Sequence, residues 1–437
     1  MHHDVIVLGA GLAGLAAARD LAAAGTDVLV LEARDRVGGR VEQTRTPDGR
    51  TVQLGGEVVG LAHTAYLRLA EELDLELVPS YVAEPGRITR STPEGLSPGD
   101  PPHWFGPGDS AQHERLGREF GELAATVNPD DPWSHPDATA LDRLSVADWL
   151  RSRHASAAVV RLWDIGQLAL AGGSYERVSL LAALRKSAAV PGMGDYDYDD
   201  WEGVRLAAGS ATLAEVMGRE LGPRIRLGSP VAALDVRPGH CTVRLGTGEG
   251  LTTGAVVCAL PVGPLRSVAV TGVSDARLAS LHRQRQAVAA KFAAVYDRPF
   301  WRAAGLSGLS EAEGVLGSTW PQHEGVLSAL VPPERYGVLL GTPPHRRTPE
   351  LLAEVAGMFG DEALRPSSCH LRMWGTDPWT QGYVTQWPPG EVMGVGPLHG
   401  THEPPFYVCG SDQWVAGYME GAVRTGRAAA EEALRRG

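Results

Sequence analysis

A glycine-rich run close to the start of the chain has the spacing of a dinucleotide-binding turn. Gly9, Gly11 and Gly14 follow the apolar run 5–8 and open a helix rich in Ala and Leu. In such a turn the first glycine allows the tight bend, the second lets the backbone approach a pyrophosphate, and the third lets helix and strand pack closely. The pyrophosphate binds the free amide groups at the positive end of the helix. Glu32 ends the next apolar run, where its carboxylate can accept hydrogen bonds from ribose hydroxyls. This order of elements predicts a dinucleotide site.

Lys291 is a second residue whose setting points to chemistry. It lies within the segment 287–296, which is otherwise apolar on both faces. Burying an ammonium group is expensive unless the group has a partner. Composition alone therefore favours a lysine on an edge strand, whose ammonium group reaches solvent at the end of its alkyl chain.

Composition and charge limit the classes of fold and partner that this chain can have. The 437 residues allow two medium domains or one large interleaved fold. A net charge of −12 argues against nucleic acid and anionic membranes as partners, and is compatible with a cationic substrate. The four cysteines lie far apart and the histidines show no ligand spacing, so we expect neither a disulfide framework nor a metal site. Without a leader or an apolar run near twenty residues, we expect a cytoplasmic protein with no membrane partner, as a monomer or a homodimer.

Other segments have patterns typical of regular structure. We expect helices in 64–77, 145–186 and 348–359, a hairpin from 231–236 and 241–245, a buried strand at 255–261, and short strands and turns in 305–343. Residues 79–136 are rich in Pro, Gly, Asp and His, which predicts irregular surface with one short helix near 113–127.

Several motifs together resemble the flavin amine oxidase family, including soluble bacterial-type monoamine oxidases. The run 33–40 follows the N-terminal signature of that family, with a second glycine pair and arginines directly after Glu32. Gly55-Gly56 matches its next flavin contact, and Lys291 precedes Pro299-Phe300-Trp301 as a lysine does there. The segments 373–385 and 406–423 are similar to the family's stretch beneath the flavin ring and to its C-terminal flavin-binding helix.

The resemblance implies FAD as the cofactor and an α/β fold with two domains. A discontinuous Rossmann-like FAD-binding domain would comprise residues 1–78, 206–280 and 377–437, and an α+β substrate domain would comprise 79–205 and 281–376. The cofactor contacts carried over are Gly9, Gly11, Gly14, Glu32, Ala33, Arg34, Gly38, Gly39, Arg40, Leu54, Gly55, Gly56, Glu57, Val231, Trp374, Gly410, Ser411, Asp412, Tyr418, Met419 and Ala422.

Four residues are expected near the reacting atoms by the same resemblance. Lys291 would hold a water at flavin N5 and help O2 react, while Trp374, Tyr383 and Tyr418 would form aromatic walls. Membrane-bound monoamine oxidases carry a flavin-linked cysteine at the position of Tyr383, so FAD here should be non-covalent. The next position is Val384 where the family has a cage aromatic, and a shift of one residue would place Tyr383 on that face instead.

The acidic segment 192–200 and the residues after it allow two interpretations. A solvated loop is the simpler one. By resemblance, however, this segment lines the substrate cavity, and Trp201 and Glu202 would then contact the substrate. A carboxylate at Glu202 would pair with a substrate ammonium group.

The predicted function is oxidation of an amine by hydride transfer from its α-carbon to flavin N5. Water would hydrolyse the imine to an aldehyde, and O2 would reoxidise the flavin and yield hydrogen peroxide. Two other enzymes share the fold: a flavin desaturase or tailoring oxidase of a natural product, and an L-amino-acid oxidase. The second places an arginine shortly after the glycine pair to hold the carboxylate, whereas this chain has Glu57. A non-catalytic FAD-binding scaffold would leave Lys291 and Tyr418 without a role.

Overall fold

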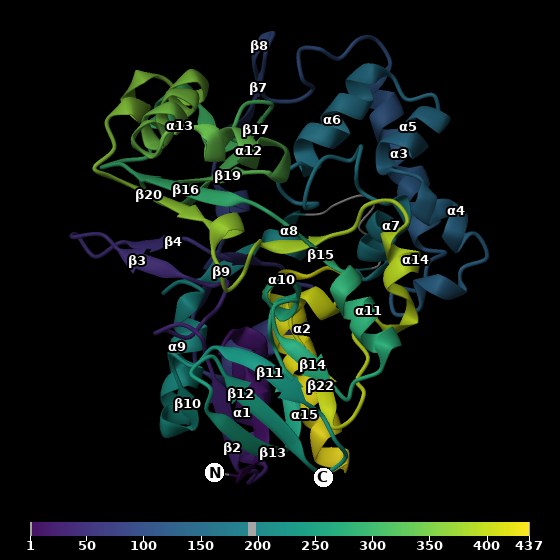
Figure 1. Ribbon diagram of the computed structural model, residues 1–437. Coiled ribbons are helices and arrows are strands. Elements are labelled where there is room, and N and C mark those ends of the chain that lie inside the picture. The colour runs from purple at the N-terminus through teal and green to yellow at the C-terminus, as the bar shows by residue number, and fades with distance from the viewer. Residues whose placement is uncertain (1, 191–197, 437) are drawn as a thin grey trace.

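The computed structural model describes residues 2–190 and 198–436. Figure 1 shows an α/β region that contains both chain ends, and above it a second sheet on one side and a block of helices on the other. The predicted acidic loop lies mostly at 191–197, outside the described residues.

The first sheet combines strands from distant parts of the chain. Its strands are β1 (His2–Leu8), β2 (Val28–Leu31), β10 (Ile225–Arg226), β11 (Val231–Asp235), β12 (Cys241–Leu245), β13 (Gly250–Cys258), β14 (Ala269–Thr271) and β22 (Phe406–Val408). They are bonded in the order β10-β2-β1-β13-β12-β11-β14, and β22 pairs with β13. β1 runs parallel to β2 and β13, and β11 and β12 form the predicted antiparallel pair. The carboxyl ends of the parallel strands therefore meet at one edge, where ligands bind in open α/β sheets.

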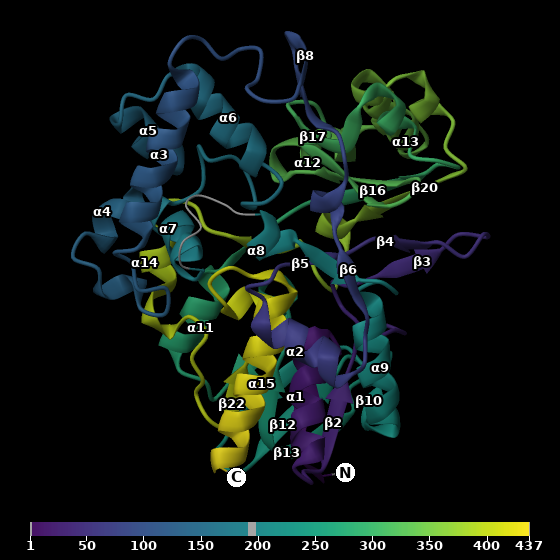
Figure 2. The same ribbon diagram turned by 180° about the vertical axis from the view of Figure 1, so that it is seen from behind.

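Both faces of β1 are buried, as its apolar run predicted. Val5 and Val7 face a core that also includes α1 (Leu12–Ala23), α2 (Thr64–Glu72), α9 (Ala211–Leu221) and α15 (Tyr418–Arg436), whereas Ile6 and Leu8 face the opposite core. Figure 2 shows α1 and α15 side by side over the first of these faces. They cross closely because Gly426 has no side chain: a Cβ there would lie 2.3 Å from the carbonyl oxygen of Ala13.

The second sheet carries Lys291 on an interior strand. Its strands are β7 (Arg87–Thr92), β8 (Gly95–Pro98), β16 (Ala290–Val295), β17 (Leu306–Ala312), β18 (Ser318–His323), β19 (Val326–Val331) and β20 (Ser368–Met373), in the order β20-β16-β19-β18-β17-β7-β8. β16 is bonded to β19 on one side and β20 on the other. The interpretation of Lys291 as an edge-strand lysine is therefore wrong, because its strand has no free edge.

A block of helices completes the upper half of the molecule (Figure 1). It consists of α3 (Asp109–Ala124), α4 (Ala138–Arg143), α5 (Val146–Ser152), α6 (Ala157–Gln167) and α7 (Leu180–Ala188), which share one apolar core. The hydroxyls of Ser145, Ser156 and Ser179 cap α5, α6 and α7 by accepting a backbone N–H from the first turn. These caps fix where each helix begins.

Shorter elements connect the larger parts. They are β3 (Gln43–Arg45), β4 (Thr51–Gln53), β5 (Val58–Val59), β6 (Leu77–Pro79), α8 (Tyr198–Glu202), β9 (Val204–Leu206), α10 (Val262–Leu265), α11 (Asp275–Arg283), β15 (Arg285–Ala287), α12 (Pro333–Gly341), α13 (Pro344–Phe359), β21 (Val384–Gln386) and α14 (Glu391–Val395).

Three local predictions were wrong. The segment 305–343 contains more than short strands and turns, because Pro333–Gly341 forms helix α12. The segment 79–136 is not only irregular surface with a helix, because β7 joins the second sheet by pairing with β17. Helix α13 begins at Pro344 rather than near Thr348, and it includes Pro349. Pro343 and Pro344 already fix backbone angles that suit a helix start, so the helix begins there.

The division into two domains stays a prediction, although each sheet draws on the segments proposed for it. No helix among residues 2–190 and 198–436 has both the length and the apolar character needed to cross a membrane.

Candidate active site

A cavity of about 880 Å³ reaches from the glycine-rich turn of the first sheet to the second sheet and the helical block. Its wall includes Gly11 at the start of α1, Lys291 on β16 and Lys186 on α7. The three parts of the fold thus meet around one space.

The glycine-rich turn has the geometry that a dinucleotide needs. Gly9 has a φ of +96°, and a Cβ on Gly14 would fall 1.9 Å from the Gly9 carbonyl oxygen, so helix and strand pack in contact there. A Cβ on Gly11, by contrast, would have no neighbour nearer than 3.9 Å. Gly11 is the N-cap of α1 and lies in the cavity wall, so the free amides of the helix start face the space where a pyrophosphate would bind.

Glu32 and the arginines after it complete this end of the cavity. The Glu32 carboxylate accepts backbone N–H groups of Ala10 at 2.7 Å and Arg34 at 2.8 Å, which fixes its orientation at the wall. The guanidinium group of Arg34 is held by Asp377 through two hydrogen bonds of 2.7 and 2.9 Å. Arg40 is held by Asp412 at 2.7 Å. These residues fit a dinucleotide cofactor such as FAD, with Arg40 available to its phosphates.

Lys291 has the partner that its burial requires. Its Nζ donates to the Glu57 carboxylate at 2.7 Å and to the Gly55 carbonyl oxygen at 2.9 Å, and both charged side chains are nearly inaccessible. The indole N–H of Trp320 donates to the same Glu57 oxygen at 3.1 Å. The other Glu57 oxygen is buried and accepts no hydrogen bond. A fixed ion pair therefore faces the cavity beside the predicted flavin contact Gly55-Gly56.

Aromatic side chains form the walls around this ion pair. Trp374 donates its indole N–H to the Leu54 carbonyl oxygen at 2.8 Å, and the Tyr383 hydroxyl donates to the Ala169 carbonyl oxygen at 3.0 Å. Tyr383 and Val384 both line the cavity, so neither is excluded from contact with a ligand. Tyr418, with a φ of +55° at the start of α15, lines it as well.

The sequence and the fold can now be compared with known proteins. A family model described as flavin containing amine oxidoreductase matches residues 12–434. This chain belongs to that family. It is 32% identical to a putrescine oxidase of Kocuria rosea, over 99% of this chain and 95% of the relative. An L-amino acid dehydrogenase of Synechocystis is 28% identical, over 98% of this chain and 94% of the relative. A solved structure of wild-type putrescine oxidase bound to putrescine superimposes with a TM-score of 0.90 at 27% identity, covering all of both chains.

The chain is accordingly a flavin-dependent amine oxidase whose cofactor is FAD, held non-covalently. The wall agrees with this attachment. Among the described residues of the wall none is a cysteine. No group of metal-ligating side chains occurs in the described part of the chain.

Acid precipitation of the purified amine oxidase should release all of its FAD into the supernatant. Denaturation breaks every non-covalent contact, whereas a thioether would survive. Absorbance at the flavin maximum in pellet and supernatant measures the result. Yellow colour that stays with the precipitated protein would contradict non-covalent attachment.

Most of the predicted site residues lie in this wall. They are Gly9, Gly11, Glu32, Ala33, Arg34, Gly38, Gly39, Arg40, Gly55, Gly56, Glu57, Glu202, Lys291, Trp374, Tyr383, Gly410, Ser411, Tyr418, Met419 and Ala422. Five others are not among the residues that line the cavity: Gly14, Leu54, Trp201, Val231 and Asp412. Asp412 was predicted to contact FAD, but its carboxylate is occupied by Arg40, the Val262 amide, Gln286 and Thr385.

Sequence reasoning missed several polar residues of the cavity. Glu311 on β17 and Arg90 on β7 form a buried ion pair of 2.7 Å in the wall, and Lys186 lies near Tyr418. An acid within the strand-like segment 306–312 was the only available signal for Glu311.

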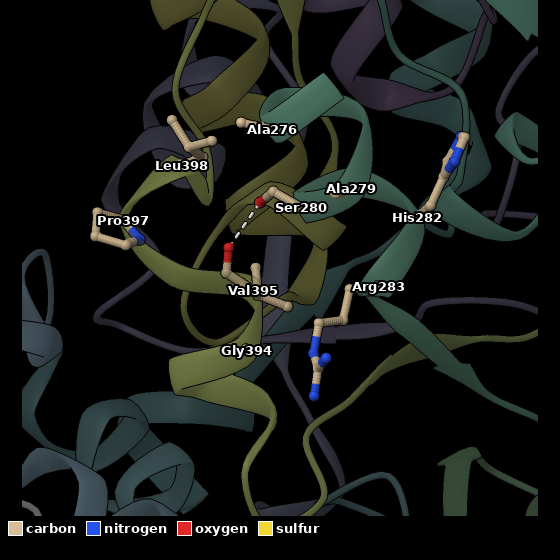
Figure 3. A pocket seen from close by; sticks show the side chains of 9 residues that line it. All are labelled: Ala276, Ala279, Ser280, His282, Arg283, Gly394, Val395, Pro397 and Leu398. Atoms are coloured by element: carbon tan, nitrogen blue, oxygen red, sulfur yellow. Dashed lines mark hydrogen bonds between the residues drawn. The ribbon is translucent and has the colours of Figure 1, made fainter. Parts of the chain in front are cut away.

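A second hollow, of about 460 Å³, lies apart from this site between α11 and α14 (Figure 3). Ser280 donates to the Val395 carbonyl oxygen there at 2.8 Å and joins the two helices. The titratable side chains among its lining residues are His282 and Arg283, and both are exposed. In the larger cavity, by contrast, the ion pair Lys291–Glu57 is buried. We therefore place the chemistry in the larger cavity.

Proposed function

We propose that this amine oxidase acts on an aliphatic diamine, and that Glu311 binds the nitrogen that is not oxidised. The observation that carries the proposal is that Glu311 and Lys291 stand at opposite ends of one row of residues across the second sheet. Lys291 pairs with Leu330, Leu330 with Ser318, and Ser318 with Glu311.

Residues directly opposite one another on neighbouring strands point to the same face of a sheet. All four residues of this row line the cavity, as that geometry requires. Three strand spacings of about 4.8 Å separate the backbones of Lys291 and Glu311 by roughly 14 Å. An extended substrate can therefore have one nitrogen near the flavin-contacting end and a second cationic group near Glu311.

The surroundings of Glu311 keep a negative charge available. Its carboxylate accepts from Arg90, but Arg90 also binds Asp100 at 2.7 Å, so one cation is shared by two carboxylates. Burial raises the pKa of Glu311, while the charge of Arg90 and its hydrogen bond oppose that change. The arrangement suits an ammonium ligand, and the similarity to putrescine oxidases supports the same substrate class.

At the other end, the chain supplies position and a dry environment. Trp374, Tyr383 and Tyr418 surround the amine, and their low polarity favours its uncharged form, the only form with a lone pair. When bound, FAD would supply the two-electron acceptor for oxidation of the carbon beside the nitrogen, and O2 and water would complete the reaction to hydrogen peroxide, an aldehyde and ammonia. Lys291 would hold a water through its ammonium group and place positive charge where O2 reacts. O2 as the acceptor and a cytoplasmic location belong to this proposal.

The alternative enzymes have less support from the site. An L-amino-acid oxidase needs a cation for the substrate carboxylate, and Glu57 stands where that branch has arginine. Arg90 is buried in the wall, but it already binds Glu311 and Asp100. A desaturase or tailoring oxidase that acts on a C–C bond would produce no aldehyde and no ammonia, and one that acts on a C–N bond of a natural product would not be reduced by simple diamines.

Glu311→Gln should lower kcat/KM for a diamine by about 10- to 100-fold, since a hydrogen bond to a charged group contributes about 1.5–3 kcal/mol. For a monoamine of equal chain length, kcat/KM of the same variant should stay within about 3-fold of the wild-type value. A monoamine has no second ammonium group that could pair with Glu311. The measurement is anaerobic flavin bleaching with a panel of monoamines, diamines of increasing length and amino acids.

Glu313→Gln is a matched control, two residues away and paired with Arg161 outside the cavity wall. It should change neither value. Equal losses for diamine and monoamine in Glu311→Gln would contradict the diamine assignment. Bleaching by amino acids alone would contradict it as well.

A further inference from the structure

A second buried carboxylate, that of Glu202, faces the cavity beside Tyr418. Glu202 is the last residue of α8 and is 4% exposed. Its Oε1 lies 3.5 Å from the Tyr418 hydroxyl, which donates to it. Glu311 is held by an arginine, whereas Glu202 receives its hydrogen bond from a neutral phenol. These two of the cavity's carboxylates are therefore in different electrostatic settings.

Aromatic rings enclose this carboxylate on the protein side. Trp201 stacks on Tyr418 with ring centroids 5.2 Å apart, and His63 lies 4.9 Å from Tyr418 and 5.5 Å from Trp201. Such surroundings solvate an anion poorly. An amine that enters the aromatic cage at Tyr418 therefore meets the Glu202 carboxylate, to which the Tyr418 hydroxyl donates.

Within residues 2–190 and 198–436, charged and titratable groups lie on the elements packed around Glu202. They are Glu57 beside β5, with Lys291 of β16 bound to it, Tyr418 of α15, His63 before α2, Tyr81 near β6, Lys186 of α7, and Asp200 and Arg205 next to Glu202 in the chain.

Their balance favours the protonated form of Glu202 at neutral pH. Burial, and after it the negative charge of Glu57, raise its pKa, the Tyr418 hydrogen bond opposes both, and together they bring the pKa to about 8. His63 contributes no positive charge, because burial and the nearby Lys186 and Arg424 lower its pKa to about 3. Burial also lowers the pKa of Lys186, to about 8.

We propose that Glu202 is the catalytic base that takes a proton from the substrate ammonium group, so that the amine reaches the flavin uncharged. In this step an N–H bond of the ammonium group breaks and an O–H bond forms on the carboxylate. One cation and one anion become two neutral groups, and no electrons are transferred. The inference rests on the proposed amine oxidation, but it does not require that the substrate be a diamine.

The cavity provides the driving force for this transfer. In water an alkylammonium group, with a pKa near 10, would not give its proton to an ordinary carboxylate near 4. In a poorly solvating site, two isolated charges cost more than the neutral pair, so the proton moves to the carboxylate. A base is also most effective when its own pKa lies close to the working pH.

The first test compares two substrates in Glu202→Gln and Glu202→Asp. One is the best amine of the substrate panel, and the other is its β,β-difluorinated analogue, whose two electron-withdrawing fluorines give it a far larger uncharged fraction at pH 7.5. Glu202→Gln should lower kcat/KM about 100-fold for the ordinary amine, within the range for general bases, and at most about 3-fold for the fluorinated one. Glu202→Asp should restore part of the activity, because it restores a carboxylate. Equal losses with both amines would overturn the proposal and indicate a structural role.

The pH profile gives the sign of the effect. The carboxylate is the active form and exists above the pKa of Glu202, so wild-type kcat/KM should rise with pH through about 8. In Glu202→Gln the rise should move to about 10, the pKa of the amine itself. An unchanged profile in the variant would overturn the assignment.

A second test needs no turnover. A tertiary-alkyl primary amine such as tert-butylamine has no hydrogen on the carbon beside nitrogen, so it can bind but cannot be oxidised. Calorimetry at pH 9 in buffers of different ionisation enthalpy counts the protons released when it binds. Wild type should release about none, because the proton passes to Glu202, and Glu202→Gln should release nearly one. Equal proton release in the two proteins would overturn the proposal, whatever amine the enzyme oxidises.

Discussion

Replacing Gly14 by alanine should abolish FAD binding and, with it, all turnover. The added Cβ would lie 1.9 Å from the Gly9 carbonyl oxygen, 3.1 Å from its carbonyl carbon and 3.2 Å from the Ala259 side chain. The nearest of these atoms belongs to the backbone of the phosphate-binding turn, and Gly9 already has a φ of +96°. The helix must therefore move away from the turn, which separates its free amides from the pyrophosphate position.

The expected loss follows from the strain of overpacking, which costs about 1–3 kcal/mol and can cost more. Because the clash of 1.9 Å is with backbone, we expect the upper end of this range, where about 3 kcal/mol lowers FAD affinity by roughly 100-fold, and the purified variant should be colourless. Measurements of bound flavin absorbance and of FAD titration into the apoprotein would show this directly.

Gly117→Ala is the control for inserting a methyl group into a helix. Gly117 lies in α3, and a Cβ there would meet nothing within 4 Å. That variant should keep its FAD and gain slightly in stability, because alanine is the better helix former. If Gly14→Ala bound FAD with wild-type affinity, the turn would be able to adapt to the added methyl group. The close approach of helix and strand would then not be required for FAD binding.

The dinucleotide end of the site could be predicted from sequence because its parts are local. Gly9, Gly11, Gly14 and Glu32 lie within one strand–turn–helix–strand unit, where spacing along the chain determines spacing in the fold. The burial of β1 on both faces could also be predicted from sequence, because a continuous apolar run is typical of a strand that is covered on both faces.

Contacts across the sheets could not be predicted in this way. The burial cost of Lys291 indicated that it needs a partner, but Glu57 lies 234 residues away and only the fold brings the two together. The row from Lys291 to Glu311 depends on the registers of three strand pairs, and no local pattern fixes those registers. The role of Arg90 in the cavity wall could not be predicted, because its strand lies in a segment with the composition of a loop.

Lys291→Met should slow the reoxidation of reduced enzyme by O2 while FAD stays bound. Lys291 faces the cavity beside Gly55-Gly56, where we propose that its charge stabilises the negative charge that develops on O2. Loss of one such preorganised group costs about 100-fold or more in rate. Stopped-flow absorbance of the substrate-reduced enzyme mixed with O2 measures the effect. Reoxidation at the wild-type rate would show that Lys291 takes no part in the reaction with O2.

The same substitution should also destabilise the fold, and the two effects must be separated. It leaves the Glu57 carboxylate buried without its cation, and breaking a buried pair from one side costs about 3–5 kcal/mol. Adding Glu57→Gln removes the stranded charge, and the amide can still accept from the Trp320 indole. The double variant should therefore regain most of the lost free energy of unfolding but keep the slow reoxidation. If stability and reoxidation recover together, Lys291 supports the structure alone; if only stability recovers, its charge serves the reaction.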